Sequence, residues 1–179
     1  AVKVTDANGN VTQTIFDRSG RVIEVIQDPL NGAAGLNLRT RYEYDLAGHV
    51  LTLTEGYGTA EARRTAYEYD NLGRRIKQVV DPDAAGYTGL KLTTTWTYDS
   101  FGRPTLETRA DGNKIAYAYE YCSGVAGGSA TCPTYGAYVV TATPKDSSNV
   151  QNGPWTKSFH DTHGRVIATD TQGFAGTTI

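Results

Sequence analysis

The segment Tyr69-Asp70-Asn71-Leu72-Gly73-Arg74 decides the fold of this chain of 179 residues. It follows Ala66-Tyr67-Glu68-Tyr69, whose side chains alternate with the period of two that is typical of a β-strand. The aspartate can accept hydrogen bonds from N–H groups inside a turn. Two ordinary residues and then a glycine suit a type I turn that ends in a left-handed bulge residue. The segment therefore predicts a β-hairpin.

The same pattern recurs along the chain: an aromatic residue, Asp, two variable residues, Gly and a basic residue. The other copies are Phe16-Asp17-Arg18-Ser19-Gly20-Arg21, Tyr44-Asp45-Leu46-Ala47-Gly48-His49, Tyr98-Asp99-Ser100-Phe101-Gly102-Arg103 and His160-Asp161-Thr162-His163-Gly164-Arg165, where His160 replaces the aromatic residue. Successive aspartates are 28, 25, 29 and 62 residues apart, so the last interval spans about two periods. A degenerate copy is therefore expected at Tyr117-Ala118-Tyr119-Glu120-Tyr121, where a cysteine-bearing insertion, residues 122–153, replaces the turn.

Each copy predicts the same role for its aspartate, glycine and basic residue. In this hairpin geometry the aspartate faces the residue four positions later, and opposite charges across two strands stabilise their pairing. The predicted structural turn residues are Asp17, Gly20, Arg21, Asp45, Gly48, His49, Asp70, Gly73, Arg74, Asp99, Gly102, Arg103, Asp161, Gly164 and Arg165.

Together the strands and turns predict an all-β fold, in which tandem antiparallel hairpins over residues 1–179 form a curved sheet. Other turns, such as Glu55-Gly56-Tyr57-Gly58 and Ala110-Asp111-Gly112-Asn113, separate the hairpins. The alternation is imperfect in Val22-Ile23-Glu24-Val25-Ile26, which predicts that both faces of this strand are partly covered. No segment has helical periodicity.

Composition excludes several classes of protein. Hydrophobic residues make up 39% of the chain and charged residues 20%, a composition that fits neither a disordered tail nor a membrane protein. No apolar run approaches the roughly 20 residues of a spanning helix. The net charge of -2 gives no basic face for nucleic acid. The chain contains no methionine and no signal peptide, so it is expected to be a fragment of a larger protein.

The repeated Tyr-Asp-x-x-Gly-Arg, together with Asp111-Gly112-Asn113, resembles the YD/Rhs repeat family. This family includes bacterial Rhs polymorphic toxins, the B and C components of insecticidal toxin complexes, wall-associated proteins and teneurins. The likeness begins near Asp6-Ala7-Asn8-Gly9-Asn10 and covers nearly the whole chain, with residues 122–153 as the main departure. The self-cleaving aspartates of toxin members have no counterpart here, so proteolysis is not carried over.

The resemblance implies that the hairpins form a segment of a spiral β-shell, which in toxin members encloses a C-terminal toxic domain. The expected function is non-catalytic: a structural segment of a large bacterial protein that is secreted or at the cell surface. The expected partners are other repeats of the parent protein, its toxin domain, and a second copy through the sheet edges. The alternative is an adhesion or carbohydrate-binding module.

The polar residues do not favour an enzyme or a metal site. Catalytic carboxylates need two distinct environments, whereas the repeated aspartates occupy equivalent turns. His160 and His163 flank Asp161, but a metal needs three or four convergent ligands and the third histidine, His49, is far away in the sequence. In Asp6-Ala7-Asn8-Gly9-Asn10 the calcium-loop pattern fails at Val11. The sequence therefore predicts no catalytic residue, metal or cofactor.

The tyrosines and tryptophans leave two interpretations open. They could form an aromatic face that stacks on sugar rings, or they could be cross-strand pairs that hold the sheet together. Packing is preferred, because the repeat places these residues identically in each hairpin. The residues concerned are Tyr42, Tyr44, Tyr67, Tyr69, Trp96, Tyr98, Tyr117 and Tyr119.

Cys122 and Cys132 are the only cysteines, and small flexible residues separate them. A disulfide between them would stabilise the protein by about 2–3 kcal/mol and would indicate an oxidising compartment. The alternative is two free thiols in a cytosolic precursor. The disulfide is preferred because it fits the secreted and surface members of the family that the repeat resembles.

Overall fold

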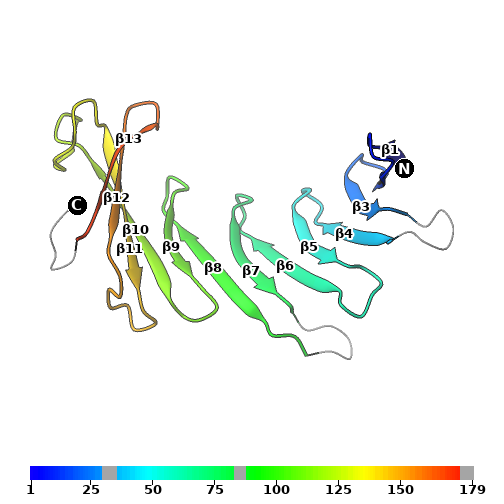
Figure 1. Ribbon diagram of the computed structural model, residues 1–179. Helices are drawn as coiled ribbons and strands as arrows, with labels where there is room; N and C mark the ends of the chain where they lie inside the picture. Colours follow the sequence, from blue (N-terminus) through cyan, green and yellow to red (C-terminus); the bar gives the residue numbers. More distant parts are fainter. Residues whose placement is uncertain (30–35, 83–87, 174–179) are drawn as a thin grey trace. The chain divides into compact units, whose positions relative to one another are not determined.

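The computed structural model describes residues 1–29, 36–82 and 88–173, and the rest of the predicted array, residues 30–35, 83–87 and 174–179, lies outside this description. All the regular secondary structure of the described residues consists of β-strands (Figure 1). None of them is a helix that could cross a membrane. The chain forms two compact units, Ala1–Thr93 and Thr94–Ile179, which are described separately.

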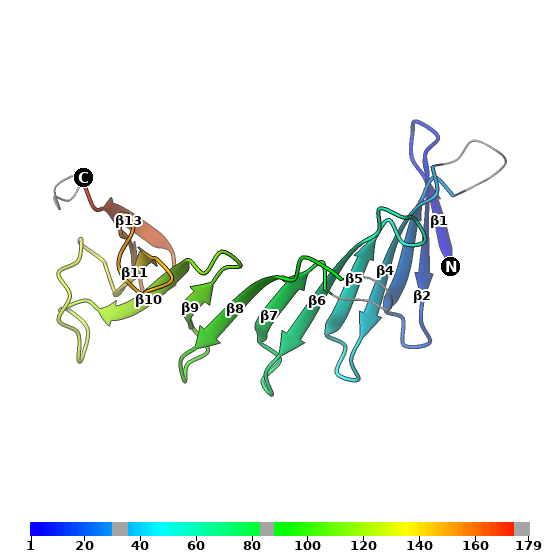
Figure 2. The same ribbon diagram turned by 90° about the horizontal axis from the view of Figure 1, so that it is seen from below.

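Unit 1 is a sheet in which each strand pairs antiparallel with the next one in the sequence. Its strands are β1 (Val2–Thr5), β2 (Val11–Phe16), β3 (Val22–Gln27), β4 (Leu38–Tyr44), β5 (Val50–Glu55), β6 (Arg63–Tyr69) and β7 (Arg75–Val80). Figure 2 shows these strands side by side in a single layer.

Unit 2 repeats this arrangement, with antiparallel pairing between successive strands. Its strands are β8 (Leu92–Tyr98), whose first residues precede the unit boundary, β9 (Pro104–Thr108), β10 (Lys114–Tyr121), β11 (Tyr138–Lys145), β12 (Thr156–His160) and β13 (Val166–Thr171). The predicted all-β fold of tandem antiparallel hairpins is confirmed.

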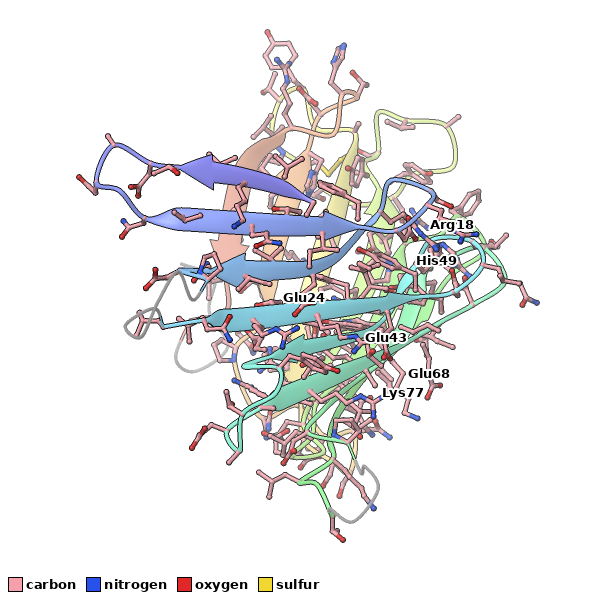
Figure 3. The ribbon with its side chains drawn as sticks, turned by 90° about the vertical axis from the view of Figure 1, so that its right-hand side faces the viewer. Arg18, Glu24, Glu43, His49, Glu68 and Lys77 are labelled. Atoms are coloured by element: carbon pink, nitrogen blue, oxygen red, sulfur yellow. A yellow bond between two sulfur atoms is a disulfide. The ribbon has the colours of Figure 1, made fainter. Side chains whose placement is uncertain are left out.

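The repeated turns gather at one end of the strands because each repeat contributes two strands. In unit 1 they join β2 to β3, β4 to β5 and β6 to β7, and in unit 2 they join β8 to β9 and β12 to β13. Figure 3 shows Arg18 and His49, from two of these turns, at the same end of the unit 1 sheet.

All five hairpins contain the same β-bulge two residues after the turn. In the first, Phe16 pairs with Val22 but Ile15 pairs with Glu24, so the second strand has one extra residue, Ile23. The corresponding extra residues of the other hairpins are Leu51, Ile76, Thr105 and Ile167. A bulge bends its strand and increases the local right-handed twist.

The first bulge accounts for the imperfect alternation at the start of β3. Antiparallel partners share a face of the sheet. Val22 and Glu24 pair with the consecutive residues Phe16 and Ile15, so they lie on opposite faces although Ile23 stands between them. Beyond the bulge the adjacent residues Val25 and Ile26 are half-buried and buried, so both faces of β3 are partly covered there, as expected. The extra residue therefore explains the adjacent apolar residues Val22 and Ile23, and the coverage of both faces explains Val25 and Ile26.

One face of unit 1 carries charged side chains paired across strands. Arg39 Nε donates to Glu24 Oε1, and Lys77 Nζ donates to Glu68 Oε1 at 2.7 Å. Glu43, on the same face, accepts a hydrogen bond from the Thr52 hydroxyl. Figure 3 shows Glu43, Glu68 and Lys77 on β4, β6 and β7.

Few side chains are fully buried, because each unit is a single layer. The largest buried cluster lies in unit 2 beside the cysteine-bearing loop, where Val139 pairs with Phe159, exposed to only 2% and 5%, in adjacent strands. Cys122 and Ala137 are also buried, and the Cys122 N–H donates to the Ala137 carbonyl. This cluster is the small core of unit 2.

Candidate functional site

The candidate site is the repeated turn, and the first copy shows its geometry. The Asp17 N–H donates to the Arg21 carbonyl at 2.8 Å, and the Gly20 N–H donates to the Asp17 carbonyl at 3.2 Å. Gly20 has a φ of 81°, in the left-handed region that favours glycine. Asp17 Oδ1 accepts from the N–H groups of Ser19 and Arg21, at 2.8 and 2.9 Å.

The aspartate also binds the side chain of the basic residue in every copy. The Arg21 Nε donates to Asp17 Oδ2 at 2.7 Å, and His49 Nδ1 lies 2.8 Å from Asp45 Oδ2. The pairs Arg74–Asp70, Arg103–Asp99 and Arg165–Asp161 have the same contact at 2.6, 2.7 and 2.7 Å. The structure thus brings together each predicted aspartate with its predicted basic partner.

These contacts lower the pKa of all five turn carboxyls. For Asp17 the main cause is the hydrogen bond from the Arg21 backbone, followed by that from its side chain. For Asp45 and Asp161 the side chains of His49 and Arg165 act most strongly. For Asp70 and Asp99 desolvation raises the pKa, but hydrogen bonds from Arg74 and Arg103 outweigh it.

The lowered pKa values decide what these carboxyls can do chemically. A general acid needs a carboxyl whose pKa is raised, so that it holds a proton near neutral pH. The turn carboxylates are instead held ionised, as acceptors for backbone and side-chain donors. Their arrangement suits closing a turn.

The basic residue also connects its own turn to the next repeat. The Arg21 guanidinium carbon lies 4.9 Å from the centre of the Tyr44 ring, within the range of a cation–π contact. Arg21 Nη1 donates to the Asp45 carbonyl at 3.0 Å, and the Tyr44 hydroxyl donates to the Val22 carbonyl at 2.6 Å. Two successive hairpins are therefore joined by three contacts.

His49 makes the equivalent connection to the third hairpin with a shorter side chain. Its ring stacks on Tyr69, with centroids 4.8 Å apart, and the Tyr69 hydroxyl donates to the Val50 carbonyl at 3.0 Å. A Cβ placed on Gly73 would lie 2.7 Å from His49 Nε2, so the turn backbone lies directly against the imidazole. A hollow of about 490 Å³ opens beside this joint.

Unit 2 contains the same connection. The Arg103 guanidinium carbon lies 4.3 Å from the centre of the Tyr119 ring, and the Tyr119 hydroxyl donates to the Pro104 carbonyl at 2.9 Å. Further along, His160 stacks on Tyr138 with centroids 4.6 Å apart. Tyr119 therefore occupies the place that Tyr44 and Tyr69 have in unit 1.

These contacts decide between the two interpretations of three of the predicted tyrosines. The rings of Tyr44, Tyr69 and Tyr119 each have a cationic or imidazole neighbour, and their hydroxyls bind backbone carbonyls. These rings therefore pack between repeats. Among the described residues, no group of three or more His, Cys, Asp and Glu side chains is placed to hold a metal ion.

The loop after β10 replaces the repeated turn. Its Cys122 N–H donates to the Ala137 carbonyl, as the aspartate N–H does to the residue four positions on in the other copies. Cys122 and Cys132 form a disulfide. The predicted insertion, residues 122–153, consists of this loop over residues 122–137, strand β11, and a tight turn that begins at Asp146.

Sequence reasoning missed that the Asp146 turn has the repeated geometry. Its N–H donates to the Val150 carbonyl at 2.8 Å, and its Oδ1 accepts from the N–H groups of Ser148 and Val150. Asn149, with a φ of 66°, takes the place of the glycine. Because asparagine tolerates the left-handed region, Asp-x-x-Asn is the signal that could have found this turn.

The two Asp-Pro dipeptides lie in turns of the second kind, which separate the hairpins. Asp28 and Asp81 lie at the opposite end of unit 1 from the repeated turns, and both have a positive φ. The carboxylate of Asp28 accepts from the Leu36 N–H at 3.0 Å, and that of Asp81 accepts from the Leu90 N–H at 2.9 Å. Each aspartate therefore closes the base of a longer loop.

No family model and no curated protein sequence matches the chain. Solved structures do. A crystal structure of TcdB2-TccC3-TEV is 16% identical, with a TM-score of 0.61 over 91% of this chain and 8% of that chain. The Photorhabdus luminescens Tc holotoxin pore with a TccC3 mutation is 15% identical, with a TM-score of 0.38 over 94% of this chain and 9% of that chain.

A crystal structure of TcdB2-TccC3-Cdc42 is 13% identical and has a TM-score of 0.36, over 99% of this chain and 11% of that chain. This chain therefore spans about a tenth of the length of the solved chains it resembles. At 16% identity, the likeness to TcdB2-TccC3-TEV shows a shared fold.

Proposed function

We propose that this chain is a non-catalytic structural segment of a large bacterial protein, and that its hairpins form part of the wall of a β-shell that encloses a toxin domain. The observation that carries this proposal is the fold shared with TcdB2-TccC3-TEV, which extends over 91% of the chain at a TM-score of 0.61. TccC3 is also named as a part of the Tc holotoxin.

The contacts between repeats support a structural role. The Arg21 side chain closes its own turn through Asp17 and also binds the Asp45 carbonyl of the next turn. A side chain that joins two hairpins in this way resists their separation, because both contacts are lost together. The recurring motif residues therefore serve the continuity of the sheet.

The proposed partners are further strands of the same parent protein, together with its toxin domain. All four residues of β1 are exposed, and a strand at the edge of a sheet presents backbone N–H and C=O groups that can pair with another strand. In the parent protein a preceding repeat would occupy this edge. In the isolated chain a second copy would do so.

The proposed location is outside the cytoplasm, by secretion or at the cell surface. The disulfide between Cys122 and Cys132 supports it, because such bonds persist in oxidising compartments.

Cryo-electron microscopy of the full product of the parent gene tests the proposal. We expect a hollow particle, with this chain in its wall and another domain of the same polypeptide inside. An extended stalk with this chain exposed on both faces would refute the shell and favour an adhesion module. A glycan array then tests that alternative, in which binding that is lost in Tyr67→Ala would identify a sugar-binding face.

A further inference from the structure

The loop of residues 122–137 differs from every repeated turn in composition. It contains no charged residue, and its ends are joined by the disulfide between Cys122 and Cys132, which are 10 positions apart. One large aromatic side chain, Tyr135, is 86% exposed on it. The loop therefore presents a single aromatic ring from an otherwise small and neutral segment.

The first half of the loop is held by its own backbone. The Ser123 N–H donates to the Ala130 carbonyl at 2.9 Å, and the N–H groups of Ser129 and Ala130 both donate to the Tyr121 carbonyl, at 3.1 and 3.0 Å. The Gly128 N–H donates to the Val125 carbonyl at 2.9 Å. This half needs no disulfide to keep its shape.

The second half, residues 131–136, is held differently. Its backbone contact is the hydrogen bond from the Gly136 N–H to the Pro133 carbonyl at 2.9 Å. A Cβ on Gly136 would lie 2.8 Å from Cys132 Cβ and 3.3 Å from Cys122 Sγ, so this turn is packed directly on the disulfide. The disulfide is therefore the main restraint on this half.

Tyr135 has a strained backbone. Its φ is 70°, in the left-handed region, where a bulky residue other than glycine is unfavourable. Such strain persists only where the surroundings enforce it. Here the turn closed by the hydrogen bond from Gly136 to Pro133 holds this conformation, and the disulfide lies against that turn at Gly136.

We propose that the Cys122–Cys132 disulfide is a redox-controlled latch that holds Tyr135 in its exposed position, and that a thiol reductant opens it by attack on Cys132. Opening releases residues 131–136, while the hairpin of β10 and β11, paired over eight residues, stays closed. The latch goes beyond the structural role proposed above, because it makes one surface of the protein depend on the redox state of its surroundings.

The site of attack follows from burial. Cys122 is only 2% exposed, whereas Cys132 is partly exposed, so an external thiolate reaches the Cys132 sulfur. The new bond joins the reductant sulfur to Cys132 Sγ. The electron pair of the broken S–S bond leaves on Cys122 Sγ, which takes up a proton. The second thiol of a dithiol then displaces Cys132, so that two electrons reach the protein and the dithiol becomes a cyclic disulfide.

Glutathione, a monothiol, tests the direction of attack. The oxidised chain is exposed to it briefly, quenched with N-ethylmaleimide and mapped by mass spectrometry. We expect glutathione on Cys132 and N-ethylmaleimide on Cys122 in the same molecules. Glutathione mainly on Cys122 would overturn the assignment.

Chymotrypsin tests the release of Tyr135, because the protease needs an extended, flexible segment around its target. The chain is reduced with dithiothreitol, alkylated and freed of reagents before digestion. We expect cleavage after Tyr135 to accelerate at least tenfold. Cleavage after Tyr57, in a loop of unit 1 held by a backbone hydrogen bond to Arg39, should not change.

A variant avoids any effect of alkylation at a buried position. The double substitution Cys122→Ala and Cys132→Ala should be cut after Tyr135 at the fast rate with or without dithiothreitol. Cleavage at the slow rate in this variant would show that the disulfide does not hold the loop. Equal acceleration after Tyr119 and Tyr138, within the strands, would show that reduction opens the hairpin, which also contradicts the latch.

Discussion

Replacing Gly73 by alanine measures the contact between two neighbouring turns. Gly73 has a φ of 76°, and an added Cβ would lie 2.7 Å from His49 Nε2 and 3.2 Å from Cε1. Gly20 has the same role in its own turn and a φ of 81°, but a Cβ there finds nothing within 4 Å. Gly20→Ala is therefore the matched control, in which only the backbone strain is introduced.

The two substitutions should lower the stability of their hairpins by amounts that differ by the free energy of one ring contact. Alanine in the left-handed region costs about 1–2 kcal/mol, and this applies to both sites. At Gly73 the His49 ring must also turn away from Tyr69, and a stacked pair of rings is worth about 0.5–1.5 kcal/mol. We therefore expect Gly73→Ala to lower the free energy of opening its hairpin by about 1.5–3.5 kcal/mol, and Gly20→Ala by about 1–2 kcal/mol.

Hydrogen exchange followed by mass spectrometry is the suitable assay, because it reports the opening of single hairpins. A change of about 1.4 kcal/mol alters a rate governed by local opening tenfold. Peptides from β6 and β7 should therefore exchange roughly ten to three hundred times faster in Gly73→Ala. Peptides from β2 and β3 should exchange roughly five to thirty times faster in Gly20→Ala.

A double-mutant cycle with His49→Ala separates strain from contact. Once the imidazole is removed, the cost of Gly73→Ala should fall to that of Gly20→Ala. An unchanged cost in the His49→Ala background would show that the imidazole does not press on this turn. Equal costs for the two glycine substitutions in the wild-type background would refute the same reasoning.

Three further predictions concern unit 2, which contains both tryptophans, so that their fluorescence during urea unfolding reports on this unit. Substituting Cys122 and Cys132 by alanine should lower its free energy of unfolding by about 2.7 kcal/mol, from the loop-closure entropy of a 10-residue separation; an unchanged unfolding midpoint would contradict this. Tyr119→Phe removes the hydroxyl that binds the Pro104 carbonyl and should cost about 1 kcal/mol, whereas no loss would mean that water replaces it. Because the pKa of Asp99 is lowered from its usual 3.8, its stabilisation is present above that pH and is lost as the pH falls below it. An acid titration of Asp99→Asn should therefore show a shallower loss of stability than the wild type, and identical titrations would exclude this carboxyl as a source.

The short-range chemistry of the turns could be predicted from the sequence. A tight turn favours an aspartate at its first position and a glycine three residues later, so the spacing of Asp70 and Gly73 identifies the hairpin. The partner of the aspartate follows from the same geometry, because Arg74 is the residue that the turn returns to it. The fold class then follows from repetition.

The contacts between repeats could not be predicted, because they depend on the register of strands that are distant in the sequence. Nothing in the spacing of Arg21 and Tyr44 indicates that the guanidinium lies over that ring. The bulge at Ile23 is equally hidden, because a skipped residue resembles a strand with two covered faces. At Asp146 the geometry was missed because Asn149 stands where a glycine was sought.

The bulge in each hairpin has a consequence for how such genes can change length. Each of the five full copies of the motif has its extra residue at the same place after the turn. Duplicating one such period by recombination would therefore add a unit with the same bend, and its charged and aromatic side chains would lie on the same faces as before. Deleting Leu51 alone would join Val50 directly to Thr52, which would keep their pairing partners but remove the bulge and its bend. Selection should therefore accept insertions and deletions of complete periods, and should remove single-codon changes beside the turns.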